Sequence, residues 1–113
     1  MERSGQFDHE LWWTAAEKKT VRRAFDKAFE RHCAVITTEV RRMPEHATAP
    51  ADIWRVQEHL SEQRSTVDRI YRYSYSGLIL IFSILMRDGL LTEADLVGLQ
   101  QEKIVRIKLG ARL

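Results

Sequence analysis

The stretch from Leu11 to Met43 contains neither glycine nor proline, and no other feature constrains the fold as much. Apolar side chains recur within it at spacings of four, four, three, four and three residues, at Phe25, Phe29, Cys33, Ile36, Val40 and Met43. This spacing predicts one long helix with an apolar stripe. A helix of about thirty residues would be about 45 Å long, and a helix of that length usually pairs with a helix of another chain. We therefore expect a helical arm over residues 1–43 and a homodimer.

Two prolines bracket the one clear loop, PEHATAP, and separate the arm from a second helix. Proline cannot continue a helix interior, so Pro44 ends the first helix, whereas Pro50 can open the next as its first residue. Asp52 then lies in the first turn, where the helix dipole favours an acid. Tyrosine and serine alternate between Arg72 and Gly77, and the sequence leaves open whether the helix continues through them.

The most apolar run of the chain, Leu78 to Met86, predicts a buried central helix. Gly89 is expected to cap its C-terminus. The run has half the length needed to span a bilayer. Thr92 and Asp95 resemble a capping box, which predicts a last helix over about Glu93–Leu109. Its packing residues would be Leu96, Leu99, Val105 and Ile107.

These elements predict an all-α protein of about four helices. We expect a single domain over residues 1–113, with the arm over 1–43 and a compact helical head over 51–109. Strand signals are absent apart from the apolar run, whose isoleucine and phenylalanine content is compatible with either state.

Composition narrows the class of function. The charged fraction is 30% and the hydrophobic fraction 44%, which is typical of a globular protein. A net charge of +2, with eighteen basic side chains nearly balanced by sixteen acidic ones, does not call for a nucleic acid partner. The single cysteine, Cys33, forbids an intramolecular disulfide and favours a reducing cytoplasm. The four histidines, at positions 9, 32, 46 and 59, share no helical spacing, so no metal site is predicted.

The second helix carries an unusual apolar stripe, formed by Ile53, Val56, Leu60, Val67 and Tyr71. By helix geometry, Arg64 lies about 20° and Gln57 about 40° from Ile53, inside the stripe. Trp54 at about 100° and Glu58 at about 140° flank it. A guanidinium on a packing face needs a counter-charge, so Arg64 either pairs with Glu58 or an acid of another helix, or meets a partner molecule.

The run ADIWRVQEHLSEQRSTVDRIYRYSYSGLILIFSILMRDGLLTEADLVGL, residues 51–99, resembles the fluorescence recovery protein family of cyanobacteria. The tryptophan, the Leu-Ser pair, the arginine, the Tyr-x-Tyr pair, Phe82 and the Asp-Gly stop occur in one register. The resemblance implies an all-helical homodimer without a cofactor, in the cytoplasm beside thylakoids and phycobilisomes. Family members bind the photoactivated orange carotenoid protein, mainly through its C-terminal domain. They speed its return to the orange form, which ends non-photochemical quenching at the phycobilisome.

The resemblance also assigns partner-binding residues. The family's important tryptophan falls on Trp54 and its essential arginine on Arg64. Glu58 stands where the family usually has aspartate, and Gln57 where it often has histidine. Leu80 replaces a functionally important phenylalanine. These departures leave two partners open, the orange carotenoid protein or a related carotenoid-binding domain.

Two other classes of protein fit a small helical dimer. An enzyme of the chorismate mutase type would need several arginines and lysines converging on two carboxylates, and the central stripe offers only Arg64. A helical DNA-binding dimer would need a clustered basic face on a recognition helix, whereas RRAF, VRRM and VRIK are scattered among acids. We therefore expect a regulatory protein that is not an enzyme.

Overall fold

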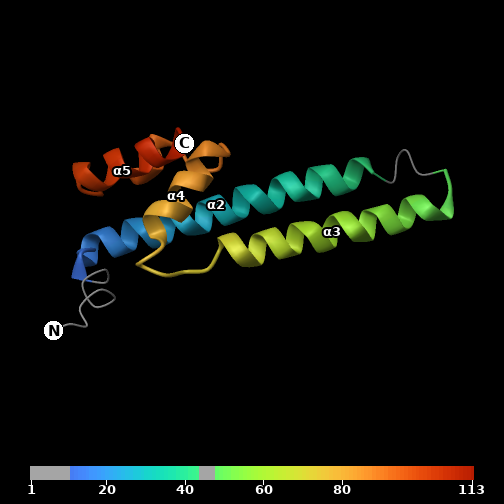
Figure 1. Ribbon diagram of the computed structural model, residues 1–113, viewed down its shortest axis with the longest axis horizontal. Helices are drawn as coiled ribbons and strands as arrows, with labels where there is room; N and C mark the ends of the chain where they lie inside the picture. The colour runs from blue at the N-terminus through green and yellow to red at the C-terminus, as the bar shows by residue number, and fades with distance from the viewer. Residues whose placement is uncertain (1–10, 44–47) are drawn as a thin grey trace. The chain divides into compact units, whose positions relative to one another are not determined.

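The structure is a computed structural model that describes residues 11–43 and 48–113. Within these ranges the chain forms four α-helices and one short 3-10 helix (Figure 1). The helices are α2 (Ala15–Arg42), α3 (Pro50–Ile70), α4 (Leu78–Arg87) and α5 (Gln101–Ala111), with the 3-10 helix η2 (Glu93–Leu96) before α5. No strand occurs in the described ranges, where the only β pairing is an isolated bridge between Val97 and Leu99. The prediction of an all-α fold is confirmed.

The long first helix is present, but it begins at Ala15 and not at Leu11. The backbone N–H of Thr14 donates to the Glu17 carboxylate at 3.0 Å, and the N–H of Glu17 donates to the Thr14 hydroxyl at 3.1 Å. This reciprocal capping satisfies N–H groups that have no partner inside the helix. Thr14 therefore fixes the start of α2.

The second helix begins at Pro50 as predicted, and Asp52 caps it. The Asp52 carboxylate accepts the N–H groups of Thr48 at 2.8 Å and Ala49 at 3.0 Å. The hydrogen bond from Thr48 is the larger cause, and together with the one from Ala49 it lowers the pKa of Asp52 below its ordinary value. The helix ends at Ile70, and residues 71–77 are not helical, which answers the question that the Tyr-Ser alternation left open. Pro44 and His46, in the predicted loop, lie outside the described residues.

The apolar run forms α4, and Gly89 ends it as predicted. Gly89 has φ of +78°, and the N–H of Leu90 donates to the carbonyl of Leu85 at 2.8 Å, as in a glycine-capped helix end. Phe82 and Leu85 are fully buried, but Leu80 is 65% exposed. The expectation of a helix buried on nearly every side is therefore wrong for Leu80, because only part of this helix surface is packed within the chain.

The predicted last helix is wrong in one respect, because it is broken in two. Residues 97–100 separate η2 from α5, and Gly98 adopts φ of +114°, which side chains rarely tolerate. A Cβ on Gly98 would lie 2.6 Å from the Thr20 hydroxyl, so the loop and α2 approach closely at this glycine.

The predicted Thr92–Asp95 capping box is present, and Leu96, Leu99 and Ile107 are buried. Val105 is 43% exposed, so its predicted packing role is wrong.

The described chain divides into two compact units. Unit 1 contains residues 11–29 and 73–113, and unit 2 contains residues 30–72 apart from 44–47. The predicted single domain over 1–113, with its arm over 1–43 and its head over 51–109, stays a prediction.

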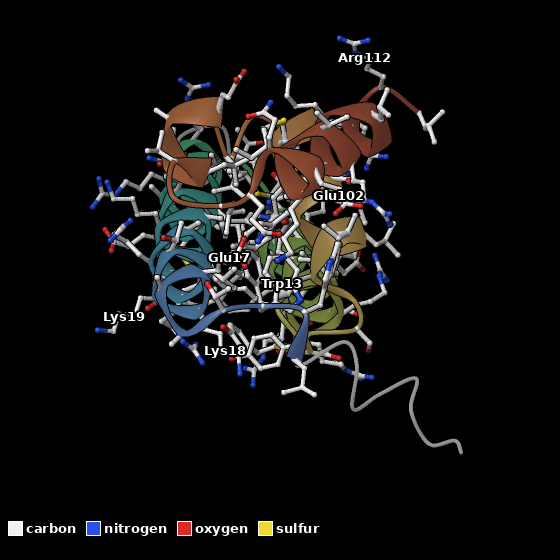
Figure 2. The ribbon with its side chains drawn as sticks, turned by 90° about the vertical axis from the view of Figure 1, so that its left-hand side faces the viewer. Trp13, Glu17, Lys18, Lys19, Glu102 and Arg112 are labelled. Carbon is white, nitrogen blue, oxygen red and sulfur yellow. The ribbon has the colours of Figure 1, made fainter. Side chains whose placement is uncertain are left out.

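Unit 1 contains nearly all of the buried core, and a buried ion pair lies within it. The Lys103 ammonium donates to the Glu17 carboxylate at 2.6 Å, and both side chains are almost fully buried. Lys103 also donates to the backbone carbonyl of Trp12 and lies 4.8 Å from the centre of the Trp13 ring. The second Glu17 oxygen accepts the N–H of Gln100 at 2.8 Å. In Figure 2, Glu17 and Trp13 lie on the inner side of the first turns of α2.

Burial alone would raise the pKa of Glu17. The hydrogen bonds from Lys103, Thr14 and Gln100, with the charge of Lys103, outweigh it and lower the pKa below its ordinary value of 4.5. A depressed folded-state pKa means that this carboxylate stabilises the fold above the unfolded-state pKa, and that the stabilisation is lost as the pH falls through the folded-state pKa.

Unit 2 is an antiparallel helical hairpin made from the second half of α2 and α3 (Figure 1). Among its described residues only Ile70 is buried. Polar contacts between its two arms include those of His32 Nδ1, which lies 3.1 Å from the Tyr71 hydroxyl, and of His59 Nε2, which lies 3.2 Å from Glu39 Oε1. The hairpin therefore lacks a hydrophobic core of its own within one chain.

Breaking the buried ion pair should destabilise the protein strongly. We expect Lys103→Met to lower the free energy of unfolding by about 3–5 kcal/mol, because it leaves the Glu17 charge buried without its partner. The double variant Glu17→Gln, Lys103→Met should recover much of this loss, since no buried charge remains. Urea unfolding at neutral pH checks both values, and a Lys103→Met protein as stable as the parent would contradict the role given to the pair.

Candidate partner-binding surface

Four of the five predicted site residues lie on α3, in unit 2, and the fifth lies on α4, in unit 1. The four are Trp54, Gln57, Glu58 and Arg64, and the fifth is Leu80. The cap at Asp52 fixes where α3 begins, and an uninterrupted helix carries that register on to Arg64.

The face of α3 that is covered within the chain is not the face that the apolar stripe predicted. The less exposed positions are Asp52, Val56, His59, Gln63, Thr66, Val67 and Ile70. They centre roughly 90° around the helix from Ile53. Ile53 is 63% exposed and Leu60 is 43% exposed. Much of the predicted packing face is thus uncovered, which fits a surface that another molecule covers.

Arg64 lies on this uncovered face and is held by its own helix. Its side chain is 80% exposed, and its Nε lies 3.3 Å from the Asp68 carboxylate one turn further along. The predicted pairing with Glu58 or with an acid of another helix is therefore wrong, because Asp68 sits at the favourable four-residue spacing. A pair this exposed contributes little to stability.

Trp54, Gln57 and Glu58 are all exposed, and Trp54 is 62% exposed. Their side chains make no hydrogen bond or ion pair within the part of the chain that the structure describes. From the helix geometry, Gln57 lies between Arg64 and Trp54 around the helix, and Glu58 lies beyond Trp54. An indole, an amide, a carboxylate and a guanidinium therefore share one exposed side of α3.

Leu80 forms part of a second apolar exposure, in unit 1. It is 65% exposed, although the neighbouring turns of α4 bury Leu78 and Phe82 completely. A leucine exposed to this extent on an otherwise packed helix can contribute apolar contact to a partner.

This surface has the composition of a protein interface. Tryptophan and arginine dominate binding energy at interfaces, and exposed aliphatic side chains beside them exclude water when covered. In residues 11–43 and 48–113 no group of three or more histidine, cysteine, aspartate or glutamate side chains could hold a metal ion. Nor does any helix there have the length and apolar character to cross a membrane.

The histidines and the cysteine have ordinary surroundings where they are described. His32 contacts Tyr71, His59 contacts Glu39, and Cys33 is a half-buried free thiol. His9 and His46 lie outside the described ranges.

Two residues with structural roles, Asp68 beside Arg64 and Lys103 in the core of unit 1, were not predicted from the sequence. Asp68 lies four residues after Arg64, and this spacing was visible in the sequence. Lys103 is fully buried, and its spacing of four residues from both Leu99 and Ile107, which are also buried, could have indicated this.

Comparison with known proteins shows which protein family the chain resembles over most of its length. A family model described as photoprotection regulator fluorescence recovery protein matches residues 13–111. The fluorescence recovery protein of Synechocystis sp. (strain PCC 6803) is 30% identical over 101 residues, which is 89% of this chain and 93% of the relative. The solved structure of the Fremyella diplosiphon fluorescence recovery protein has a TM-score of 0.83 and 34% identity, covering 89% of this chain and 99% of that chain. The Synechocystis structure has a TM-score of 0.83 and 30% identity, with the same coverage.

Arg64 should not be needed for folding. We expect Arg64→Leu to change the free energy of unfolding by no more than about 0.5 kcal/mol, because it removes only an exposed ion pair with Asp68. Arg55 offers a matched control, since it is also exposed on α3 and pairs with Asp52 at 3.2 Å. Urea unfolding of Arg64→Leu and Arg55→Leu measures both, and a large loss confined to Arg64→Leu would make Arg64 a structural residue.

Proposed function

The chain belongs to the fluorescence recovery protein family, and from that premise we propose that it binds the photoactivated orange carotenoid protein, or a related carotenoid-binding domain. It binds the C-terminal domain of that partner and accelerates the return to the inactive orange form. Non-photochemical quenching at the phycobilisome ends as a result. This activity would take place in the cytoplasm, at the thylakoid face that carries the phycobilisomes.

The family is one of photoprotection regulators and is not a known enzyme family. The proposal gives the chain a binding role, and it invokes no catalytic residue and no cofactor.

The observation that carries the proposal is the uncovered face of α3. It exposes Trp54 and holds Arg64 at the surface through a single pair with Asp68. Neither residue is needed to fill a core within unit 2, so a structural role does not account for them. We assign partner binding to Trp54, Gln57, Glu58 and Arg64, with Leu80 as an apolar contact from unit 1.

The roles of these residues follow from their chemistry. The Arg64 guanidinium can leave Asp68 for a carboxylate or carbonyl of the partner at little cost, since the exposed pair is weak. Trp54 supplies a large apolar area together with an N–H donor. Glu58 lies furthest from Ile53 around the helix, where a charge remains screened by water and contributes least.

We also propose a homodimer, formed through unit 2. Two helices that bury only Ile70 cannot form a stable core, whereas two such hairpins can form a four-helix bundle. The exposed apolar residues Val35, Ile53 and Leu60 are available for this contact. In this arrangement the whole chain, residues 1–113, acts as one functional domain.

The recovery assay tests the partner role of Arg64. We expect Arg64→Leu to slow the red-to-orange recovery of a photoactivated orange carotenoid protein to near its unassisted rate. An arginine at the centre of an interface contributes about 2 kcal/mol or more to binding, which corresponds to about thirtyfold in affinity. Glu58→Ala should slow recovery less. Arg55→Leu, on the opposite side of α3 by helix geometry, should behave as the parent. If Arg64→Leu accelerates recovery as well as the parent does, Arg64 has no partner role.

The dimer is tested by light scattering at micromolar concentration. The parent should have a mass near twice 13.3 kDa. Ile53→Glu should shift the mass toward that of the monomer, because it places a charge in the dimer contact. Leu109→Glu changes another exposed apolar residue, in unit 1, and should leave the mass unchanged. A monomeric parent, or an Ile53→Glu protein that stays dimeric, would remove this face from the dimer.

A further inference from the structure

The exposed half of the first turns of α2 carries a row of positive charge that the α3 surface does not use. Lys19, Arg23 and Lys27 repeat at four-residue spacing and are all exposed. Such a row is about 12 Å long and follows the helix axis closely. Figure 2 shows Lys19 pointing outward, away from the side on which Glu17 is buried.

These three cations have no ion pair within the described residues, unlike several other cations of unit 1. Elsewhere in the unit, Arg87 pairs with Asp88, Lys108 with Glu93, and Arg106 with Glu102. Like charges at four-residue spacing destabilise a helix slightly, so the row opposes the formation of α2. A feature that breaks a local folding rule without a compensating contact in the chain is typical of a binding site.

Two further cations flank the row and are ordered by aromatic rings. Arg22 lies 4.0 Å from the centre of the Tyr73 ring, and Lys18 lies 5.0 Å from that of Tyr75. Within residues 18–27 the one exposed acid is Asp26, which lies 3.8 Å from Arg22. The face between Lys18 and Lys27 therefore keeps a strong excess of positive charge.

We propose that this face of α2 is a docking site for an acidic helix of a protein partner, which presents carboxylates at every fourth residue. Carboxylates with that spacing on a facing helix match the pitch of the row, so each cation meets one acid. Arg23 can hold a carboxylate with two parallel hydrogen bonds.

The neighbouring chemistry disfavours the other anionic partners. Single-stranded nucleic acid is bound on open aromatic rings, but the rings of Tyr73 and Tyr75 are already engaged by cations and by each other, with centres 5.5 Å apart. A membrane-surface helix needs an exposed apolar face beside its basic one. The exposed arc between Lys18 and Lys27 carries no apolar side chain, because Val21, Ala24 and Phe25 are buried on the other side of α2.

Fluorescence anisotropy of the full chain tests this site independently of carotenoid recovery. The probe is a labelled alanine-rich peptide with glutamate at every fourth position, and the same peptide with glutamine is the control. We expect the glutamate peptide to bind, the glutamine peptide not to bind, and the affinity to fall as salt shortens the screening length to about 10 Å at 0.1 M.

The double variant Lys19→Glu, Arg23→Glu should bind the glutamate peptide roughly tenfold more weakly or worse, because the repulsive charges meet the carboxylates directly. The double variant Arg87→Glu, Arg112→Glu changes the net charge equally at other exposed positions of unit 1 and should bind as the parent. Circular dichroism should show the helix content of the parent in both variants.

The following results would overturn the proposal. No binding of the glutamate peptide, or equal losses in both double variants, would leave only non-specific attraction. Tighter binding to a DNA duplex, or to phosphatidylglycerol vesicles, that the Lys19→Glu, Arg23→Glu variant loses would identify a nucleic acid or membrane surface instead. A peptide with the same glutamates clustered at one end should bind more weakly, and equal binding would contradict the proposed match of spacing.

Discussion

The two helices of unit 2 bury very little between them, and this shapes the unit. A helix side chain is shielded only where a neighbour covers it, and each helix of a hairpin has one neighbour. Only Ile70 is buried among the described residues of unit 2, although the hairpin carries Ile53, Trp54 and Leu60. Covering these side chains with another molecule removes apolar area from water, which favours association. The surface that we assign to binding is thus also the surface that the hairpin cannot protect.

Unit 1 buries its apolar side chains among more elements than the two helices of unit 2. The first half of α2, α4, η2 and α5 together bury Leu78, Phe82, Leu96 and Ile107 completely. The desolvation of Glu17 and Lys103 is offset there because each charge has several partners, including the N–H of Gln100 for Glu17 and the carbonyl of Trp12 for Lys103. The contrast explains why one unit can hold buried charge while the other leaves tryptophan in water.

The helices could largely be predicted from the sequence because their signals are local. The glycine-free and proline-free stretch gave α2, Pro50 gave the start of α3, and Gly89 gave the end of α4. The Thr-Ala-Ala-Glu run from Thr14 also had the pattern of a capping box, and it would have placed the start of α2 correctly. The break at Gly98 was harder to predict, because Leu96 and Leu99 have helical spacing while the turn depends on Thr20, far away in the sequence.

The candidate site was predicted less completely. Periodicity put Arg64 and Gln57 among apolar residues and placed Trp54 beside them, and the structure exposes all three. The pattern could not say whether a face is covered by the same chain or by another molecule, so the stripe and the covered face differ by roughly 90° around α3. Lys103 shows the converse difficulty, because a lysine in a charged helix gives no sign that its partner is a glutamate 86 residues away.

The hairpin has a consequence for the order in which the protein folds. Unit 1 is discontinuous, since residues 30–72 lie between its two segments, and joining distant segments normally costs loop-closure entropy. An antiparallel hairpin forms from local contacts and therefore rapidly. Its two ends then lie close together, as the contact between His32 and Tyr71 shows. Once the hairpin has formed, the two halves of unit 1 therefore meet as though few residues separated them.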